Sequence, residues 1–281
     1  MSSSNGHPHI SSPMATSSTA QTASQRAHDL LPHAPQYSLR GSLPNTPLSV
    51  SVISALLGGL VGASIVSAAI PSLSHLGLSG WVWTSSRLGW YGAAMGVFHL
   101  LEFWTTAGWN PQKLSVDAFL LNNTNQYWFA HAFGVAEYLV SSAFFPGKFS
   151  SGPWTSPVWS LGVIALLVGG QALRSLAMIH ASTSFSHVVK AVKHDDHVLI
   201  THGVYAWSRH PSYAGFFYWA IATQLLLGNV VSTAMFALVL GRFFSARIKD
   251  EERHLVRFFG DDYVNYRKRV GTGLPFFIGT A

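Results

Sequence analysis

The chain is short of charged residues. Of its 281 residues only 10% are Asp, Glu, Lys or Arg, whereas 48% are hydrophobic. An ordinary soluble domain has about 25% charged residues. Three long runs, 41–86, 149–173 and 210–241, contain no charged residue at all. A soluble surface needs more charge than this, so the composition indicates an integral membrane protein.

Cysteine is absent. Its absence excludes disulfides, CxxC redox chemistry and thiolate metal sites, and leaves no acceptor for S-acylation. The histidines that come closest to a metal-binding spacing are His194 and His197. They lack a third convincing ligand, so we expect no metal site.

The formal net charge of +6 raises the possibility of a nucleic-acid partner. Most Lys and Arg residues lie at or beyond position 190, beside apolar segments. Cytoplasmic loops of membrane proteins collect Lys and Arg in this way, whereas a nucleic-acid-binding surface would present a basic stripe. The sequence therefore favours membrane lipid as a partner and excludes nucleic acid.

The chain divides into three predicted regions. Residues 1–45 are rich in Ser, Thr, Pro and His and contain no long apolar run, so we expect a disordered tail and not a signal peptide. Residues 46–180 contain four apolar segments, at 48–70, 88–106, 126–145 and 157–178, and are predicted to form the N-terminal transmembrane helices. Residues 181–281 are predicted to carry the chemistry.

The last apolar run is too long for one membrane crossing. Residues 211–241 would form a helix about 46 Å long, which exceeds a hydrocarbon core of about 30 Å. Gly228-Asn229 near the middle supplies a turn, which predicts a helical hairpin. We expect its second arm to continue to Phe259 as an amphipathic helix. The sequence thus predicts an all-α, polytopic membrane protein of about six to seven transmembrane helices.

Three acidic side chains lie in or next to the apolar segments. They are Glu102, Asp117 and Glu137. Ionisable groups at membrane depth are costly and often functional. Asp117 falls in a predicted loop and the other two lie near predicted span ends, so we favour a structural role such as hydrogen bonding between helices.

The motif Arg209-His210-Pro211-Ser212-Tyr213 precedes the predicted hairpin. Pro211 suits the first turn of a helix, where backbone amides lack partners. Those amides, the positive helix end and Arg209 together suit an anion. Arg and Tyr also commonly mark the membrane boundary, so an interfacial anchor is the alternative.

Arg247 and Glu251 lie four residues apart, on one face of the predicted second arm. A solvated ion pair at this spacing contributes only a few tenths of a kcal/mol. Alternatively, Arg247 binds a carboxylate through two hydrogen bonds, and Glu251 binds a cationic or hydroxyl-bearing cofactor. The spacing alone leaves both interpretations open.

Several segments together resemble the isoprenylcysteine carboxyl methyltransferases of the endoplasmic reticulum. The matching segments are LSVDAFLLNN (114–123), FSHVV (185–189), HVLITHGVYAWSRHPSYAGFFYW (197–219), RFFSARIKDEERHLVRFFGDDYVNYRKRV (242–270) and TGLPFF (272–277). RHPxY alone is weak, because other membrane methyltransferases and some sterol reductases carry similar loops. RHPSY followed in order by the acidic cluster, FFG and TGLPF is much more specific.

The resemblance implies an enzyme that transfers a methyl group in line from S-adenosylmethionine to the C-terminal S-prenylcysteine carboxylate of CaaX proteins after proteolysis, such as Ras-like GTPases and prenylated peptide pheromones. It also implies a multi-pass protein of the endoplasmic reticulum membrane, with cofactor-binding segments and the C-terminus facing the cytosol.

The resemblance further implies a set of site residues. Arg247 falls at the position that addresses the substrate carboxylate, and Glu251 closes the cofactor site. Lys190 stands where such proteins tend to have a glutamine that contacts the cofactor. The cofactor-binding residues implied are Lys190, His197, Val198, Leu199, Ile200, Tyr205, His210, Pro211, Ser212, Tyr213 and Glu251.

Three other functions compete with this one. A membrane methyltransferase acting on a phospholipid amine would need a site for a neutral amine, and Arg247 argues against it. A sterol reductase using NADPH would need a basic phosphate-binding set, which is not evident in the sequence. In a membrane scaffold without enzymatic activity, the same motif would only anchor helices.

Overall fold

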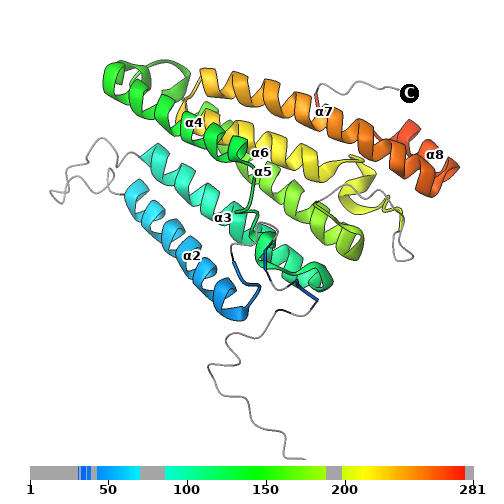
Figure 1. The fold of residues 1–281 in the computed structure, drawn as a ribbon. Helices are drawn as coiled ribbons and strands as arrows, with labels where there is room; N and C mark the ends of the chain where they lie inside the picture. The colour runs from blue at the N-terminus through cyan, green and yellow to red at the C-terminus, as the bar shows by residue number, and fades with distance from the viewer. Residues whose placement is uncertain are drawn as a thin grey trace, which may run out of the picture.

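The computed structural model describes residues 31, 33–35, 37–38, 43–69, 86–187 and 198–275. In these residues the regular structure is helical (Figure 1), which confirms the predicted all-α class. The longer helices are α2 (Pro47–Ala69), α3 (Ser86–Trp109), α4 (Asn125–Phe144), α5 (Pro157–Ala181), α6 (Pro211–Leu227) and α7 (Val231–Phe259). A shorter helix, α8 (Asp261–Arg269), follows α7.

The helices match the apolar segments of the sequence. Helices α2 to α5 coincide with the four predicted spans to within a few residues. By length and hydropathy, α2, α5 and α7 are each able to cross a membrane. The chain is therefore a polytopic membrane protein, whereas the count of six or seven spans stays a prediction.

The predicted hairpin is formed by α6 and α7. Gly228 adopts the left-handed conformation (φ 73°) that the turn requires and that glycine adopts without strain. Asn229 Nδ2 donates to Gly134 O at 2.7 Å, which fastens the turn to α4. The second arm continues without a break to Phe259, as expected.

The start of α7 is capped by Glu137 of α4. Its carboxylate accepts the backbone N–H groups of Val230 (2.9 Å), Val231 (3.0 Å) and Ser232 (2.6 Å). A carboxylate at a helix N-terminus satisfies amides that lack partners within the helix and opposes the positive helix end. The expected structural role of Glu137 is thereby confirmed.

Two glycines allow α5 and α6 to approach closely. A Cβ atom on Gly170 would lie 2.6 Å from the backbone nitrogen of Trp219, and one on Gly215 would lie 2.6 Å from that of Arg174. Figure 1 shows the two helices side by side. This contact sets how closely α6 packs against α5 near Arg174.

A similar contact joins α2 to α3, and its small residues are Gly89 of α3 with Ser64 and Ala68 of α2. A Cβ on Gly89 of α3 would lie 2.6 Å from Ser64 O and from the backbone nitrogen of Ala68. The glycines of α2 itself, Gly58 and Gly62 among them, have no neighbouring atom within 4 Å of such a Cβ. Ser and Ala make the close contact.

The end of the tail predicted to be disordered is ordered. Asn45 is fully buried, its Nδ2 donates to Pro35 O at 2.8 Å, and its Oδ1 accepts the N–H of Val116 at 2.7 Å. The latter bond caps the short helix η3 (Val116–Phe119) in the loop after α3. Leu31, within the predicted tail, also contacts this residue, since its N–H donates to Asn45 O. The domain boundary at residue 45 stays a prediction. Most of the tail lies outside the described residues.

The glycine contact between α5 and α6 can be tested with a neighbouring control. We expect Gly170→Ala to destabilise the protein by about 1–3 kcal/mol, because the added methyl group meets backbone atoms that cannot move alone. Gly169→Ala adds its methyl group to open space and should be neutral or stabilising by up to about 1 kcal/mol. Thermal unfolding in detergent measures both, and equal shifts in the two variants would contradict the predicted contact.

Candidate active site

The RHPSY motif lies at the start of α6 and is held by the C-terminal part of the chain. Arg209 forms a buried ion pair with Glu252 through its Nε atom, and its Nη1 donates to Val270 O at 2.7 Å. His210 Nε2 lies 3.1 Å from Glu252 Oε1. The charge of Arg209 is therefore compensated by Glu252, and Arg209 fastens the motif to α7.

The TGLPF segment packs against the same motif. Ser208 Oγ donates to Thr272 O at 2.7 Å, and Arg209 N donates to Gly271 O at 2.9 Å. Gly273 has φ 78°, and a Cβ there would lie 2.7 Å from Ser208 Oγ, so the position requires glycine on both counts. The RHPSY motif, Glu252 of the acidic cluster and residues 271–273 thus meet in one place.

A polar pocket opens beside these motifs. It encloses about 690 Å³ between its walls, including its open mouth. Every implied cofactor residue that the structure describes lines it, namely Val198, Leu199, Ile200, Tyr205, His210, Pro211, Ser212, Tyr213 and Glu251. Lys190 and His197 lie outside the described residues, as does His194.

The sequence missed about half of this pocket wall. The additional lining residues come from the end of α5 and the segment after it (Ala181, Ser184, Phe185, Ser186), from the motif itself (Arg209), and from α7 and α8 (Leu255, Phe259, Tyr263, Tyr266). The aromatic residues of α8 carried a signal, since Tyr263 and Tyr266 are spaced to share one face of a short amphipathic helix.

The pocket wall suits a cofactor that is partly aromatic and partly cationic. Apolar side chains such as Leu199 and Ile200 line it together with tyrosine rings and the carboxylate of Glu251. Burial raises the pKa of Tyr205 and raises that of Tyr266 to about 12, so both phenols stay neutral at pH 7. Aromatic faces and a carboxylate are the groups that attract an organic cation.

Arg247 and Glu251 are joined through a third residue. Arg247 Nε donates to the Tyr213 hydroxyl at 2.8 Å, and that hydroxyl donates to Glu251 Oε2 at 2.6 Å. Arg247 Nη2 also donates to His187 O. The pair is therefore not the simple solvated ion pair that the spacing allowed, because Tyr213 holds both side chains at the edge of the polar pocket.

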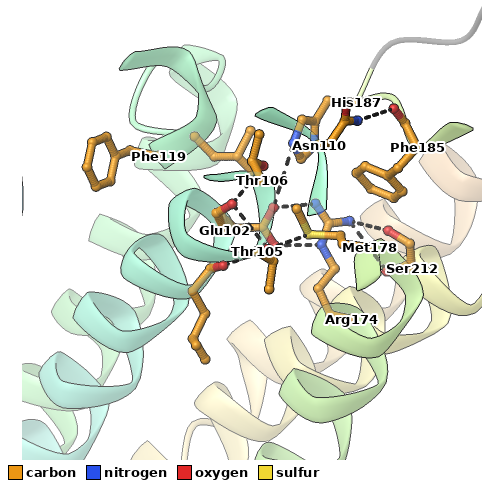
Figure 2. A network of polar contacts seen from close by, with 12 residues as sticks. Glu102, Thr105, Thr106, Asn110, Phe119, Arg174, Met178, Phe185, His187 and Ser212 are labelled. Atoms are coloured by element: carbon orange, nitrogen blue, oxygen red, sulfur yellow. Dashed lines mark hydrogen bonds and ion pairs between the residues drawn. The ribbon is translucent and has the colours of Figure 1, made fainter. Parts of the chain in front are cut away.

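A buried ion pair lies directly behind the motif (Figure 2). Arg174 Nε donates to Glu102 Oε1 at 2.7 Å, and Nη2 donates to Glu102 Oε2 at 3.0 Å. The remaining guanidinium nitrogen, Nη1, donates to Ser212 Oγ at 2.7 Å. Glu102 has the structural role expected of it, between α3 and α5. Arg174 is not among the residues predicted from the sequence, although a lone charge at the end of an uncharged run of 25 residues was a usable signal.

The third acidic residue, Asp117, lies in η3 and accepts a hydrogen bond from Asn122 Nδ2. Both residues belong to the loop between α3 and α4. The loop position expected for Asp117 is confirmed.

An apolar pocket lies between α4, α6 and α7. It encloses about 1630 Å³, including its open mouth, and Tyr127, Phe216 and Leu240 are among its lining residues. Phe243 of α7 is its last lining residue towards the C-terminus. Arg247 follows one helical turn later on the same helix, about 6 Å along the axis. Arg247 therefore lies between the apolar pocket and the polar one.

The chain is similar to known proteins of one family. The model of the isoprenylcysteine carboxyl methyltransferase family matches residues 163–257. A protein-S-isoprenylcysteine O-methyltransferase of Schizosaccharomyces pombe is 43% identical over 75% of this chain and 93% of its own length. One from Saccharomyces cerevisiae is 49% identical over 65% of this chain and 77% of its own length.

A solved structure of a eukaryotic intramembrane Ras methyltransferase of this family is also similar. It superposes with a TM-score of 0.72 at 34% sequence identity, over 81% of this chain and 76% of its own. The helices, the three converging motifs and these relatives lead to one conclusion: the chain belongs to the isoprenylcysteine carboxyl methyltransferase family.

Proposed function

We propose that this chain methylates the α-carboxylate of a C-terminal S-prenylcysteine, with S-adenosylmethionine as the methyl donor. The observation that carries the proposal is the position of Arg247. It lies one helical turn from the apolar pocket and is hydrogen-bonded to Tyr213, which lines the polar pocket. A guanidinium between an apolar pocket and a polar one suits a substrate that is a carboxylate attached to a lipid.

The polar pocket fits the cofactor in its chemistry. Leu199, Ile200 and the tyrosine rings can hold an adenine base, and Glu251 provides a negative charge near a sulfonium. When bound, S-adenosylmethionine supplies an activated methyl group that an ionised carboxylate oxygen can accept in line. Relatives carrying a methyltransferase name support a methyl donor in this place.

The residues of this chain orient the substrate carboxylate and take no part in proton transfer. An α-carboxyl group has a pKa of about 3.5 and is already ionised at pH 7, so the reaction requires no general base. Arg247 has one guanidinium nitrogen, Nη1, that makes no hydrogen bond to the described residues. That nitrogen is available to orient a carboxylate, and arginine keeps its charge at every physiological pH.

The apolar pocket suits the prenyl chain. Burying the fifteen carbons of a farnesyl group contributes on the order of 10 kcal/mol as an upper bound. Transfer of the chain through water would lose this energy, so the prenyl group should reach the pocket from the lipid between α4, α6 and α7. The charged cofactor should reach its own pocket from the aqueous side.

We further propose the cellular setting implied by the family. The substrates are prenylated CaaX proteins after proteolysis, Ras-like GTPases and prenylated peptide pheromones among them. The protein resides in the endoplasmic reticulum membrane with its cofactor pocket facing the cytosol. Esterification removes one negative charge and thereby strengthens attachment of the product to an anionic membrane surface.

The carboxylate-binding role of Arg247 can be tested in membranes containing this chain. With radiolabelled S-adenosylmethionine and N-acetyl-S-farnesylcysteine, we expect base-labile methyl ester from the wild type. Arg247→Ala should lower kcat/KM roughly 100-fold, because a buried substrate charge loses its partner. Arg247→Lys should lower it roughly tenfold, because lysine keeps the charge without the planar fork.

Arg242→Ala is the matched control, because Arg242 is exposed on the same helix. It should retain wild-type activity. A wild-type chain that binds the cofactor but forms no ester would refute the proposed function. Equal losses in the Arg242 and Arg247 variants would refute the role of Arg247.

Glu251 should recognise the positive charge of the cofactor. Glu251→Gln keeps an oxygen that can accept the Tyr213 hydroxyl but removes the negative charge. We expect it to raise the Kd for S-adenosylmethionine roughly tenfold, about 1.4 kcal/mol. The Kd for S-adenosylhomocysteine, which lacks the sulfonium charge, should change much less. Equilibrium binding to the detergent-solubilised protein measures both.

Asp250→Asn serves as the control for Glu251. Asp250 is exposed and pairs with Arg253 at 3.1 Å on the outer face of α7. Its substitution removes the same charge one residue away and should leave both affinities unchanged. If Glu251→Gln weakens the two ligands equally, Glu251 supports the pocket and does not recognise the sulfonium.

A further inference from the structure

Helix α7 places two opposite charges one turn apart without pairing them directly. Arg247 and Glu251 have the i, i+4 spacing at which side chains of a helix reach each other, and both are half-buried. In the part of the chain that the structure describes, Arg247 donates only to neutral groups, the Tyr213 hydroxyl and His187 O. The positive charge of Arg247 is therefore not compensated by the described residues.

The hydroxyl group of Tyr213 lies between the two charges. It accepts a hydrogen bond from Arg247 Nε at 2.8 Å, and it donates its own proton to Glu251 Oε2 at 2.6 Å. A phenol has one proton to donate, so these two bonds fix the direction of the chain of hydrogen bonds. Arg247 Nε is thus directed at a neutral oxygen and not at the carboxylate that follows one turn later.

The ring of Tyr213 is held on both faces. The ring of His210 stacks on it at a centroid distance of 5.6 Å, and that of Phe244 at 5.1 Å. The guanidinium carbon of Arg247 lies 5.4 Å from the centre of the same ring. Phenylalanine at this position would keep these three ring contacts and lose only the hydroxyl group. The function of the hydroxyl can therefore be separated from that of the ring.

An unobstructed Glu251 would compete with the substrate. The α-carboxylate of a prenylcysteine and the Glu251 side chain are both carboxylates, and each can pair with a guanidinium. Glu251 belongs to the same helix as Arg247, so it is always present at a high effective concentration, whereas the substrate has to arrive from the membrane. A direct pair between them would neutralise both charges of the site at once.

We propose that Tyr213 is a positioning residue, whose hydroxyl keeps Glu251 from pairing with Arg247. Arg247 then stays available to the substrate carboxylate, and Glu251 stays available to the sulfonium of the cofactor. This inference rests on the proposed function and adds to it how two opposite charges, one turn apart, are kept for two different ligands. It also adds a second role to the cofactor contact that the resemblance implies for Tyr213.

The test is whether a second substitution rescues the first. At saturating S-adenosylmethionine, Tyr213→Phe should raise the KM for N-acetyl-S-farnesylcysteine roughly tenfold, the effect of a hydrogen bond to a charged group. The double variant Tyr213→Phe/Glu251→Gln should lower this KM again roughly threefold, because the competing carboxylate is gone. If the hydroxyl only tethered Arg247, removing the charge of Glu251 would bring no recovery.

Tyr213→Phe/Asp250→Asn is the matched control. Asp250 is exposed and pairs with Arg253, so its substitution removes a negative charge next to Glu251 but no competitor for Arg247. It should leave the raised KM of Tyr213→Phe unchanged. Thermal unfolding in detergent establishes that each variant is folded. Recovery in this control would assign the rescue to net charge and not to Glu251, and would overturn the inference.

Glu251→Gln alone decides the matter if Tyr213→Phe does not fold. With the hydroxyl in place Glu251 does not compete, so the KM for N-acetyl-S-farnesylcysteine at saturating cofactor should not fall below the wild-type value. A lower KM in this variant, or no recovery in a folded double variant, would overturn the inference and leave the proposed function intact. A wild type that forms no ester would overturn both.

Discussion

The site depends on an ion pair that has to be satisfied inside the helix bundle. A carboxylate or guanidinium removed from water is strongly destabilising unless its hydrogen bonds are all made. Glu102 takes two of the Arg174 donors, and Ser212 Oγ takes a third. Since Ser212 belongs to the first turn of α6, the pair that joins α3 to α5 also positions the start of the RHPSY helix. Any displacement of α6 would leave a buried charge with a missing partner.

The glycine contact adds a second constraint on the same helix. Gly170 and Gly215 bring the backbones of α5 and α6 together one turn from Arg174. The contact fixes the distance between the helices, and the Arg174–Ser212 bond fixes their register. Because the distance and the register of α5 and α6 are both fixed, the position of Tyr213, which follows Ser212, is fixed as well. Tyr213 reaches α7 and contacts Arg247 and Glu251. Rigid support of this kind allows a site to act by orientation alone.

The sequence predicted the helices more completely than the contacts among them. The hydrocarbon core limits helix length, so an uncharged run as long as 211–241 had to turn, and it turns at Gly228. Most of the implied cofactor residues gather because they lie between 198 and 213, beside the start of α6, whereas Glu251 reaches them from α7. Arg174 and Glu102 are 72 residues apart, and Arg209 and Glu252 are 43 apart. No local spacing encodes such pairs, which is why the sequence left Arg209 open between an anion site and an interfacial anchor.

Helix α7 shows why this chemistry requires a membrane boundary. Leu240 and Phe243 line the apolar pocket, whereas Arg247 and Glu251 are the polar side chains of the next two turns. The change occurs within about 17 Å of helix. A prenylcysteine has the same change in polarity, with its thioether between a hydrocarbon chain and a carboxylate. A helix that crosses from lipid to water therefore has the same order of polarity as a prenylcysteine, and Arg247 lies where the helix changes from apolar to polar.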